Sequence, residues 1–129
     1  MMHKIILILS SVFLLVACEK NTYVYFQFRN VSDTPIVVSG HDLIHNWAIQ
    51  DTILVGEEKN IAMWSKFGKD LTYFSPVDFF GDDLLIVNAQ GDTLTKDYKD
   101  FNNWQPTIDE DRAVATHNYL FEIQEADFN

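Results

Sequence analysis

The sequence predicts an all-β fold, an immunoglobulin-like antiparallel β-sandwich of about seven strands with one short helix, after a cleaved signal peptide. Three observations predict it. Short alternating or apolar runs are separated by turn residues at regular spacing, no long stretch shows the 3.6-residue periodicity of a helix, and no internal repeat is present. A small β-barrel is the main alternative.

The first strand is expected at Thr22–Arg29, where aromatic and β-branched residues predominate. Its residues Val24, Phe26 and Phe28 are spaced two apart, so this face should enter the core. A turn follows, and the second strand is expected at Ile36–Ser39. We expect these two strands to form an antiparallel pair.

Two hairpins are expected in the middle of the chain. Thr52–Val55 and Asn60–Trp64 flank the first, around the polar turn Gly-Glu-Glu-Lys. Leu84–Val87 and Thr93–Thr95 bracket the second, around Asn-Ala-Gln-Gly-Asp. The second turn is the clearest hairpin signal in the sequence because it combines Asn, Gly and Asp between two apolar runs.

A short helix is expected between these two hairpins. Ser75 is a suitable N-cap, Pro76 occupies the first helical position, and Asp78 places an acid in the first turn. Gly81 should limit the helix to about a turn and a half.

The last strand is expected at Asn118–Gln124, which alternates well. The alternation places Tyr119, Phe121 and Ile123 on one side, so this side should enter the core. The stretch before it, which contains Pro106, is expected to be irregular.

The start of the chain has the layout of an export signal. A weakly basic beginning precedes about a dozen mostly apolar residues from Ile5 to Val16, and a small residue precedes Cys18. The apolar run is too short for a membrane-spanning helix, which needs about 20 apolar residues. The segment Leu15-Val16-Ala17-Cys18 resembles the lipobox of bacterial lipoproteins. This resemblance implies cleavage just before Cys18 and a lipid on its sulfur.

The lipobox resemblance sets the expected organisation of the chain. Residues 1–17 are the signal peptide, residues 18–21 are a lipidated tether, and residues 22–129 form the β-sandwich domain. The lipid on Cys18 is the only bound group expected, and no disulfide can form because the chain has one cysteine. Two or more acyl chains hold a protein on a membrane without a spanning segment, since each buried methylene contributes about 0.8 kcal/mol.

The chain is acidic, and removal of the signal with its single lysine changes the formal net charge from −10 to −11. This charge repels phosphate backbones and anionic head groups. Nucleic acid is therefore not an expected partner, and membrane contact should rest on the lipid anchor. A domain of this length can bury about two-thirds of its unfolded surface, which is enough for a core without metal or disulfide support.

Several segments together resemble small lipoproteins of the Bacteroidota type, many of which have no assigned activity. These segments are the lipobox, residues 30–40 after the opening strand, residues 51–57, Ser75-Pro76, residues 119–123, and Asp127-Phe128. The resemblance implies a cell-envelope location, as an outer membrane lipoprotein that is periplasmic or surface-exposed. Surface-exported members often carry a run of acids after the cysteine. Only Glu19 stands there in this chain, so both locations stay open.

A metal site is conceivable at His41 and His45, with Asp42 or the distant His117 as the third ligand. The two close histidines would share one face of a helix, where residues four apart are neighbours. The segment lies between expected strands, however, so helical geometry is not expected. We interpret these histidines as solvent-exposed loop residues and predict no metal.

No catalytic residue is assigned. The sequence has no serine in a nucleophile elbow and no glycine-rich phosphate loop, and its cysteine is assigned to the lipid. Asp82 and Asp83 are adjacent and would point apart on a strand, and the charge run 109–111 is expected to be a solvated loop. A glycosidase needs two carboxyl groups about 5 to 10 Å apart across a cleft. A domain of this size has little room for such a cleft, so we predict that the protein is not an enzyme.

Aromatic and hydroxyl side chains supply the remaining candidate sites. Trp47 and Trp104 are candidate ligand-binding residues, because flat rings in loops can stack on sugar rings or anchor a protein partner. Thr52 and Thr93 stand at the centre of acid, hydroxyl, apolar triplets. These triplets resemble the O-glycosylation motif of exported Bacteroidota proteins. The alternative is that Asp-Thr simply begins a strand after a turn.

We therefore predict a lipid-anchored cell-envelope protein whose role is non-catalytic binding of a protein or a glycan. This function predicts a contiguous aromatic patch on one loop end or sheet face. A small inhibitor or immunity lipoprotein is an alternative, and it would concentrate the acidic charge on one protruding loop. A glycan-directed hydrolase is a further alternative, and it would need two converging carboxylates or a metal-bound water.

Overall fold

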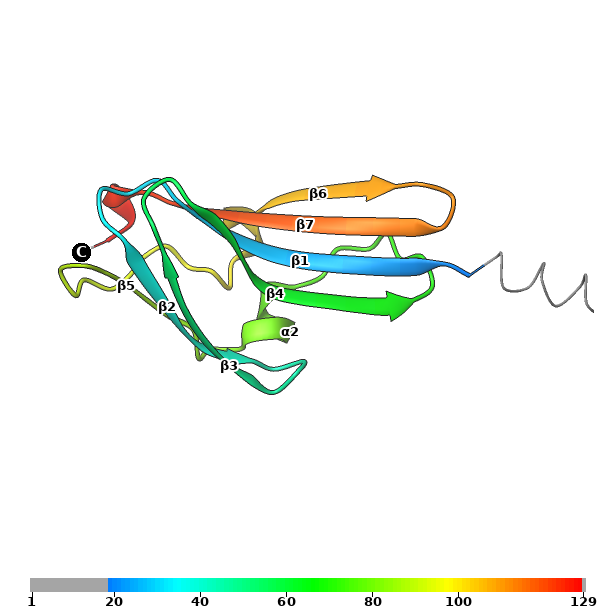
Figure 1. The fold of residues 1–129 in the computed structure, drawn as a ribbon, viewed down its shortest axis with the longest axis horizontal. Helices are drawn as coiled ribbons and strands as arrows, with labels where there is room; N and C mark the ends of the chain where they lie inside the picture. The colour runs from blue at the N-terminus through cyan, green and yellow to red at the C-terminus, as the bar shows by residue number, and fades with distance from the viewer. Residues whose placement is uncertain (1–18, 129) are drawn as a thin grey trace, which may run out of the picture.

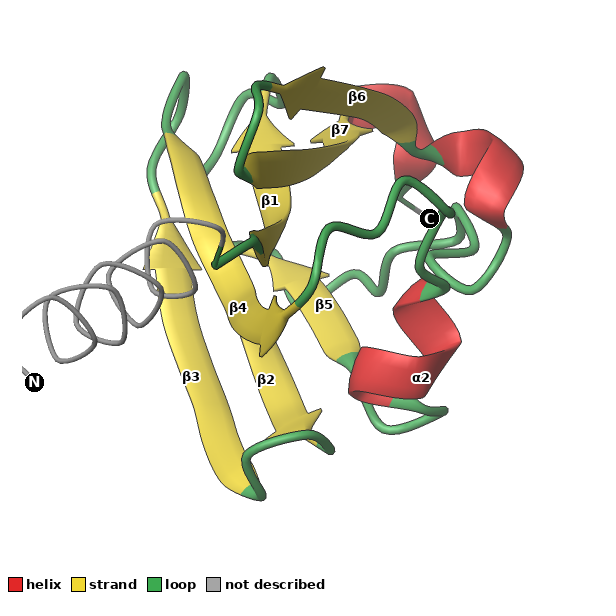
Figure 2. Cartoon of the chain, turned by 90° about the vertical axis from the view of Figure 1, so that its right-hand side faces the viewer, coloured by secondary structure: helices red, strands yellow, loops and turns green. Residues whose placement is uncertain are grey.

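A computed structural model describes residues 19–128, so the expected lipobox residues Leu15, Val16, Ala17 and Cys18 lie outside the described residues. The described chain is a sandwich of two β-sheets, and the predicted all-β sandwich is confirmed (Figure 1). Figure 2 shows the two layers from one end. The larger sheet contains, in spatial order, β4 (Glu58–Phe67), β1 (Asn21–Asn30), β7 (Val114–Ile123) and β6 (Gln105–Glu110). The smaller contains β3 (Trp47–Ile53), β2 (Ile36–Asp42) and β5 (Leu85–Asn88).

The central pair of the larger sheet is parallel. β1 and β7 run in the same direction, with Asn21 opposite Val114 and Asn30 opposite Ile123, whereas the other strand pairs are antiparallel. This pair departs from the purely antiparallel arrangement expected from the sequence. The strand order also differs from that of the immunoglobulin domains. A parallel pair requires a long crossover, and nearly the whole domain lies between these two strands.

Two expected strand pairings are wrong. The first strand does not pair with Ile36–Ser39, because β1 lies between β4 and β7 while β2 belongs to the smaller sheet. The third and fourth strands also lie in different sheets, with β3 on β2 and β4 on β1. The turns that follow β1 and β3 therefore cross from one sheet to the other. Alternation in sequence shows which side of a strand faces the core, but it does not show which sheet the strand joins.

The fully buried Asn30 links these two crossings. Its Nδ2 atom donates to the carbonyl oxygens of Thr34 at 2.9 Å and Ile53 at 3.0 Å. Its Oδ1 atom accepts from the backbone nitrogen and the hydroxyl of Ser32, at 2.9 and 2.6 Å. Each polar atom of the buried amide is therefore satisfied, and the side chain fixes the corner where the chain leaves the larger sheet.

The second of the two hairpins expected in the middle of the chain is confirmed in a reduced form. β5 pairs mainly with β2. It is joined to the segment after the turn by an isolated bridge between Val87 and Thr93, and the backbone nitrogen of Leu94 donates to the carbonyl oxygen of Ile86 at 2.9 Å. The turn itself is held by Asn88, whose Oδ1 atom accepts from the backbone nitrogens of Gln90 and Asp92 at 3.1 and 2.8 Å.

The core is built from the alternating faces that the sequence indicates. The side chains of the predicted inner faces of β1 and β7 are all fully buried: Val24, Phe26, Phe28, Tyr119, Phe121 and Ile123. Phe26 lies at the centre of this core. Its ring centroid is 4.5 Å from that of Phe79 and 4.9 Å from that of Tyr119.

The predicted short helix is confirmed as α2 (Pro76–Phe80). Pro76 stands at its start and Gly81, with φ 57°, ends it. Ser75 occupies the N-cap position as expected, although its side chain makes no capping hydrogen bond. The helix is retained by burial of Phe79 and Phe80 instead.

The stretch around Pro106 is a strand, which corrects the expectation of an irregular segment. β6 also includes Asp109 and Glu110, which were expected in a solvated loop. β6 is the outer strand of its sheet and pairs only with β7. An edge strand tolerates proline and outward-pointing acids because one of its sides needs no hydrogen-bond partner. Two 3-10 turns complete the secondary structure of residues 19–128, at Phe101–Asn103 and Glu125–Asp127.

The larger sheet projects beyond the smaller one at the end where β1 begins (Figure 1). There the segment 68–75 covers its inner face. The backbone nitrogen of Asp70 donates to Thr22 Oγ1 at 2.8 Å, and that of Phe74 donates to the Tyr119 hydroxyl at 2.9 Å. Within residues 19–128, no helix has the length and apolar character needed to cross a bilayer.

Candidate functional site

The two candidate tryptophans have opposite environments. Trp104 is only 4% exposed, and its Nε1 atom donates to the carbonyl oxygen of Tyr98 at 2.7 Å. Its ring lies 5.4 Å from those of Phe26 and Phe28. The expectation that Trp104 binds a ligand is therefore wrong, because its ring is part of the core. Trp47, by contrast, is 65% exposed.

A buried carboxylate holds the hairpin that presents Trp47. Asp42 is 4% exposed and ends β2, and its Oδ1 atom accepts from the backbone nitrogens of Ile44 and His45 at 2.9 and 3.1 Å. Its Oδ2 atom lies 2.8 Å from His45 Nδ1. Asn46 completes the turn with φ 56°, in the left-handed region that asparagine tolerates. The turn therefore has a fixed shape.

The imidazole of His45 in turn supports the indole. The two rings of His45 and Trp47 stack with centroids 4.5 Å apart and an interplanar angle of 18°. Because an ionised carboxylate only accepts hydrogen bonds, the Nδ1 atom of His45 carries a hydrogen. Asp42 thus orients His45, and His45 covers part of the indole while most of Trp47 stays open to solvent.

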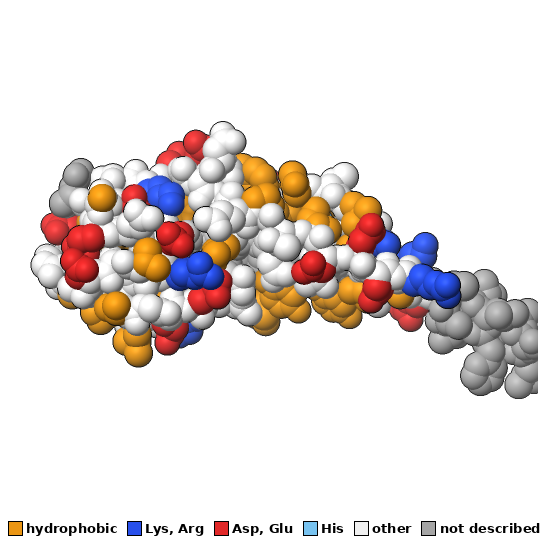
Figure 3. All heavy atoms as spheres, turned by 90° about the horizontal axis from the view of Figure 1, so that it is seen from above, with side chains coloured by type: hydrophobic (Ala, Val, Ile, Leu, Met, Phe, Trp, Pro, Cys, Tyr) orange, Lys and Arg blue, Asp and Glu red, His pale blue; other side chains and the backbone are white. Residues whose placement is uncertain are grey.

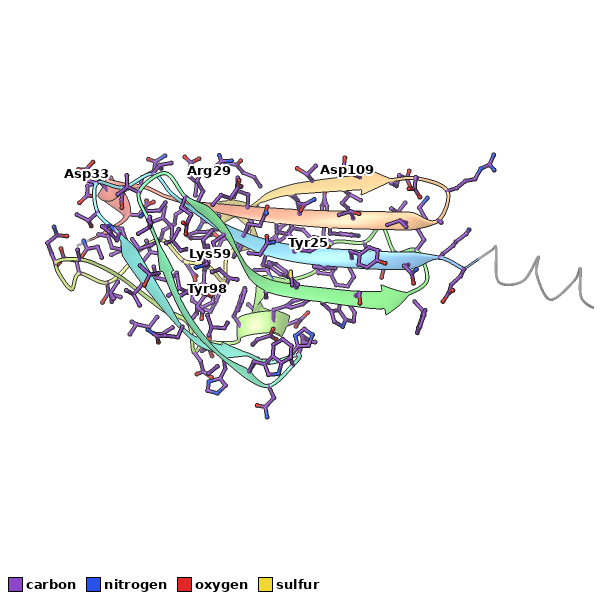
Figure 4. The ribbon with its side chains drawn as sticks, in the orientation of Figure 1. Tyr25, Arg29, Asp33, Lys59, Tyr98 and Asp109 are labelled. Carbon is purple, nitrogen blue, oxygen red and sulfur yellow. The ribbon has the colours of Figure 1, made fainter. Side chains whose placement is uncertain are left out.

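A groove begins beside Trp47 and follows β4. Its first hollow, of about 230 Å³, lies between the hairpin tip and residues 60–63 of β4. It shares His45 and Met63 with a second hollow of about 220 Å³, which Tyr23 and Tyr25 also line. Figure 4 labels Tyr25 on β1, beside β4.

The groove ends at the projecting end of the larger sheet. The second hollow shares Tyr23 and Ser65 with a third, of about 130 Å³, which Phe67 closes. We call these three hollows together the β4 groove. The second and third hollows lie over the outer face of the larger sheet, where Tyr25 is opposite Met63 and Tyr23 is opposite Ser65. Among the described strands, β4 is the outer one next to β1. Phe67 is 81% exposed and Met63 is 54% exposed, so the groove presents aromatic and apolar side chains to solvent.

The charges in and beside the groove are paired. The Lys66 Nζ atom lies 2.6 Å from Asp70 Oδ2. The hydrogen bond from Lys66, with further bonds from the hydroxyl and backbone nitrogen of Thr72, holds the pKa of Asp70 well below its usual range. The pair connects Lys66, which lines the third hollow, to Asp70 in the segment 68–75, which covers the inner face of the sheet.

A larger hollow of about 300 Å³ lies elsewhere, beside β5 and the segment 93–99. Its polar groups are engaged with one another. The Tyr98 hydroxyl donates to the carbonyl oxygen of Gly81 at 2.9 Å and accepts from the backbone nitrogen of Leu84 at 3.2 Å. Burial raises the pKa of Tyr98. The exposed Lys99 Nζ lies 3.2 Å from Asp82 Oδ1. This hollow presents no exposed aromatic ring, so we favour the β4 groove as the site.

The histidines considered for a metal site do not come together. His41 is an exposed residue of β2, whereas His117 is fully buried in the larger sheet. The Nε2 atom of His117 lies 2.6 Å from the carbonyl oxygen of Asp70, and its Nδ1 atom lies 2.7 Å from the Tyr119 hydroxyl. In the part of the chain that the structure describes, no group of three His, Cys, Asp or Glu side chains could hold a metal ion.

The acidic side chains of residues 19–128 are distributed over many elements rather than gathered on one protruding loop. Figure 3 shows them scattered over one face, between basic and apolar side chains. Asp111 has a local role, since its Oδ1 atom accepts from the backbone nitrogens of Ala113 and Val114, at 2.8 Å each. These two bonds lower the pKa of Asp111 and hold the turn between β6 and β7.

The two candidate glycosylation residues are both on the surface. Thr52 is an exposed residue of β3, and Thr93 is exposed directly after the turn that follows β5. Their hydroxyls are therefore accessible to a modifying enzyme, and the modification stays a prediction.

Most residues of the β4 groove were not predicted as site residues from the sequence. His45 was interpreted as a loop residue, and Met63, Tyr23 and Tyr25 were not singled out. One signal was present, because the first strand has aromatic residues on both of its faces, whereas a solvated outer face usually alternates with polar residues. No protein-family model, no curated protein and no solved structure matches this chain. The function of the groove is therefore argued from its geometry.

Proposed function

We propose that this protein is a lipid-anchored cell-envelope protein that binds a ligand through the β4 groove, without catalysing a reaction. The observation that carries the proposal is the exposed indole of Trp47, held by His45 and the buried Asp42. An ordered aromatic ring loses little conformational entropy on binding. A protein that only needed a soluble hairpin would gain nothing from an indole at this position.

The sequence before the domain supports the anchor. Cys18 ends a short apolar run with the layout of an export signal, and only two residues separate it from the start of β1 at Asn21. The third hollow of the groove also contains Asn21, so this end of the groove would lie nearest the membrane, and Trp47 would lie at the other end. We propose an outer membrane lipoprotein, either periplasmic or surface-exposed.

Metabolic labelling with an alkyne palmitate tests the anchor. The wild-type protein is expected to take up the label and fractionate with membranes, and Cys18→Ala is expected to be unlabelled and to leave the membrane fraction. An unlabelled wild-type protein whose fractionation does not change in Cys18→Ala would refute the anchor.

A thermal-shift screen tests the binding function, because a ligand that binds only the folded state raises Tm. The full-length protein in non-ionic detergent is mixed with polysaccharide, peptide and lipid fractions of the producing cells and their medium. At least one fraction should raise the Tm of the wild type and not that of Trp47→Ala. If every fraction shifts both proteins equally, the groove is not a binding site.

A further inference from the structure

The acidic and basic side chains that line the β4 groove each have an internal partner. These are Asp42 and His45, whose Oδ2 and Nδ1 atoms lie 2.8 Å apart, and Lys66, whose Nζ atom lies 2.6 Å from Asp70 Oδ2. A charged ligand would have to break one of these pairs or remain without a counter-charge. The groove is therefore suited to an uncharged ligand.

The groove also contains neutral hydrogen-bonding groups that are not engaged within the described chain. They are the hydroxyls of Tyr23, Tyr25 and Ser65 and the amide of Asn60, none of which makes a side-chain hydrogen bond to another described residue. Hydroxyls both donate and accept, and an amide offers two donors and an acceptor. A ligand rich in hydroxyl groups can bond to them without displacing any internal partner.

The shape of the groove limits the ligand further. It extends along β4 from Asn60 to Phe67, a distance of about 23 Å, since a strand rises about 3.3 Å per residue. A flat indole lies at one end of this path, and the partly exposed Tyr23 lies further along it. The arrangement suits an elongated ligand that contains ring-shaped units.

We infer that the β4 groove binds an elongated, uncharged glycan. A sugar ring has a face of C–H bonds that packs on an aromatic ring and a rim of hydroxyls that form hydrogen bonds. The face of one sugar packs on Trp47, and hydroxyls along the chain bond to Asn60, Tyr25 and the groups beyond. This inference rests on the proposed binding function and names the ligand class.

An extended peptide is the rival occupant, because it could add a strand to the open edge of β4. Such a peptide would use the backbone of β4 and would leave the neutral side-chain groups of Tyr23, Tyr25 and Asn60 without a role. The lining of the groove therefore favours the glycan.

Native affinity electrophoresis of the full-length protein in non-ionic detergent separates the two ligands. The neutral probes are galactomannan, xyloglucan, mixed-linkage glucan, yeast mannan and starch. The other probes are anionic alginate and a soluble peptide of alternating Thr and Val. At least one neutral polysaccharide is expected to retard the wild type, with a dissociation constant raised at least tenfold in Trp47→Ala and less in Trp47→Phe.

Tyr73→Ala is the matched control, because Tyr73 is an aromatic residue that is 62% exposed and lies outside the groove. It should bind as the wild type does, and circular dichroism of each variant checks the fold. The glycan inference is overturned if no neutral polysaccharide retards the protein, or if Trp47→Ala and Tyr73→Ala weaken binding equally. Retardation by the peptide alone, lost in Trp47→Ala, would overturn the glycan and leave the binding function standing.

Discussion

Trp104 and Trp47 lie in two regions that place the same type of side chain in opposite environments, one buried and one exposed. In the core, the indole of Trp104 is enclosed by Phe26, Phe28 and Phe121, and its single polar atom is bonded to a backbone carbonyl. At the hairpin tip, the indole of Trp47 is exposed to solvent. The buried polar group there is the carboxylate of Asp42, which contacts His45, and the His45 ring stacks on the indole. A buried ring with a satisfied N–H indicates a structural role. The exposed ring of Trp47, supported by a buried carboxylate, is the observation on which the proposed binding role rests.

The largest expected effect lies in the core region. Trp104→Ala removes a ring from the centre of the sandwich and should lower the free energy of unfolding by about 3–5 kcal/mol. Urea unfolding followed by circular dichroism measures it. A loss below about 1 kcal/mol, comparable to that of a surface substitution, would show that Trp104 is not a core residue and would remove the contrast with Trp47.

Removal of a tyrosine hydroxyl, from the buried Tyr119 or from Tyr25 on the outer face, tests the same contrast between the two regions. Tyr119→Phe removes the oxygen that accepts from Phe74 N and lies 2.7 Å from His117 Nδ1, so a part-buried backbone nitrogen and a buried imidazole nitrogen lose a partner. The expected loss is about 1–3 kcal/mol. Tyr25→Phe removes a hydroxyl on the outer face of the sheet, and its unfolding free energy should change by less than about 0.5 kcal/mol. Equal losses in the two variants would contradict the assignment.

Asp42→Asn tests whether the hairpin tip is held as the structure indicates. The variant keeps Trp47 and the shape of the side chain, but it weakens the bonds to His45 and Ile44. We expect a loss of about 1–2 kcal/mol in unfolding free energy, because hydrogen bonds to charged groups are the stronger ones. Ligand affinity should fall although the indole is present. An unchanged affinity with reduced stability would show that the order of the hairpin is unimportant for binding.

The smallest expected effect is a loss of folding stability at acidic pH, which comes from protonation of the Asp70 carboxylate. Its pKa is depressed in the folded protein, so this carboxyl stabilises the fold above its unfolded pKa of about 3.9 and loses that contribution as pH falls below it. The pair with Lys66 is partly exposed, so the effect should be at most about 1 kcal/mol. Lys66→Met should flatten the decrease of Tm between pH 5 and pH 2, relative to the wild type. An equally steep decrease would contradict this origin.

The side of each strand that faces the core could be predicted from the sequence, whereas the strand with which it pairs could not. Alternation correctly placed Phe26 and Tyr119 in the core, because a strand with one buried face must repeat every two residues. The parallel pairing of β1 with β7 joins residues about ninety positions apart, and no local pattern encodes it. Pro106 was misleading for a different reason, since proline excludes a central strand but not an edge strand.

The candidate site could be predicted only at Trp47. An aromatic residue after a turn is equally compatible with burial and exposure, and Trp104 has the same local signature. What separates the two is the contact of Asp42 with His45 and the position of Trp47 opposite β4, an element that the sequence does not place beside it. The groove thus depends on how the two sheets are arranged, which only the structure provides.

The position of β1 between two neighbours has a mechanical consequence. A chain held at Glu19 and pulled by a bound ligand at β4 transmits the load along the axis of β1, through its ladder with β4. Force along a strand shears all the bonds of a ladder together, whereas force across a strand opens them one by one. If the chain is anchored at Cys18 and binds its ligand at β4, as proposed, the β1–β4 ladder would bear such a load in shear.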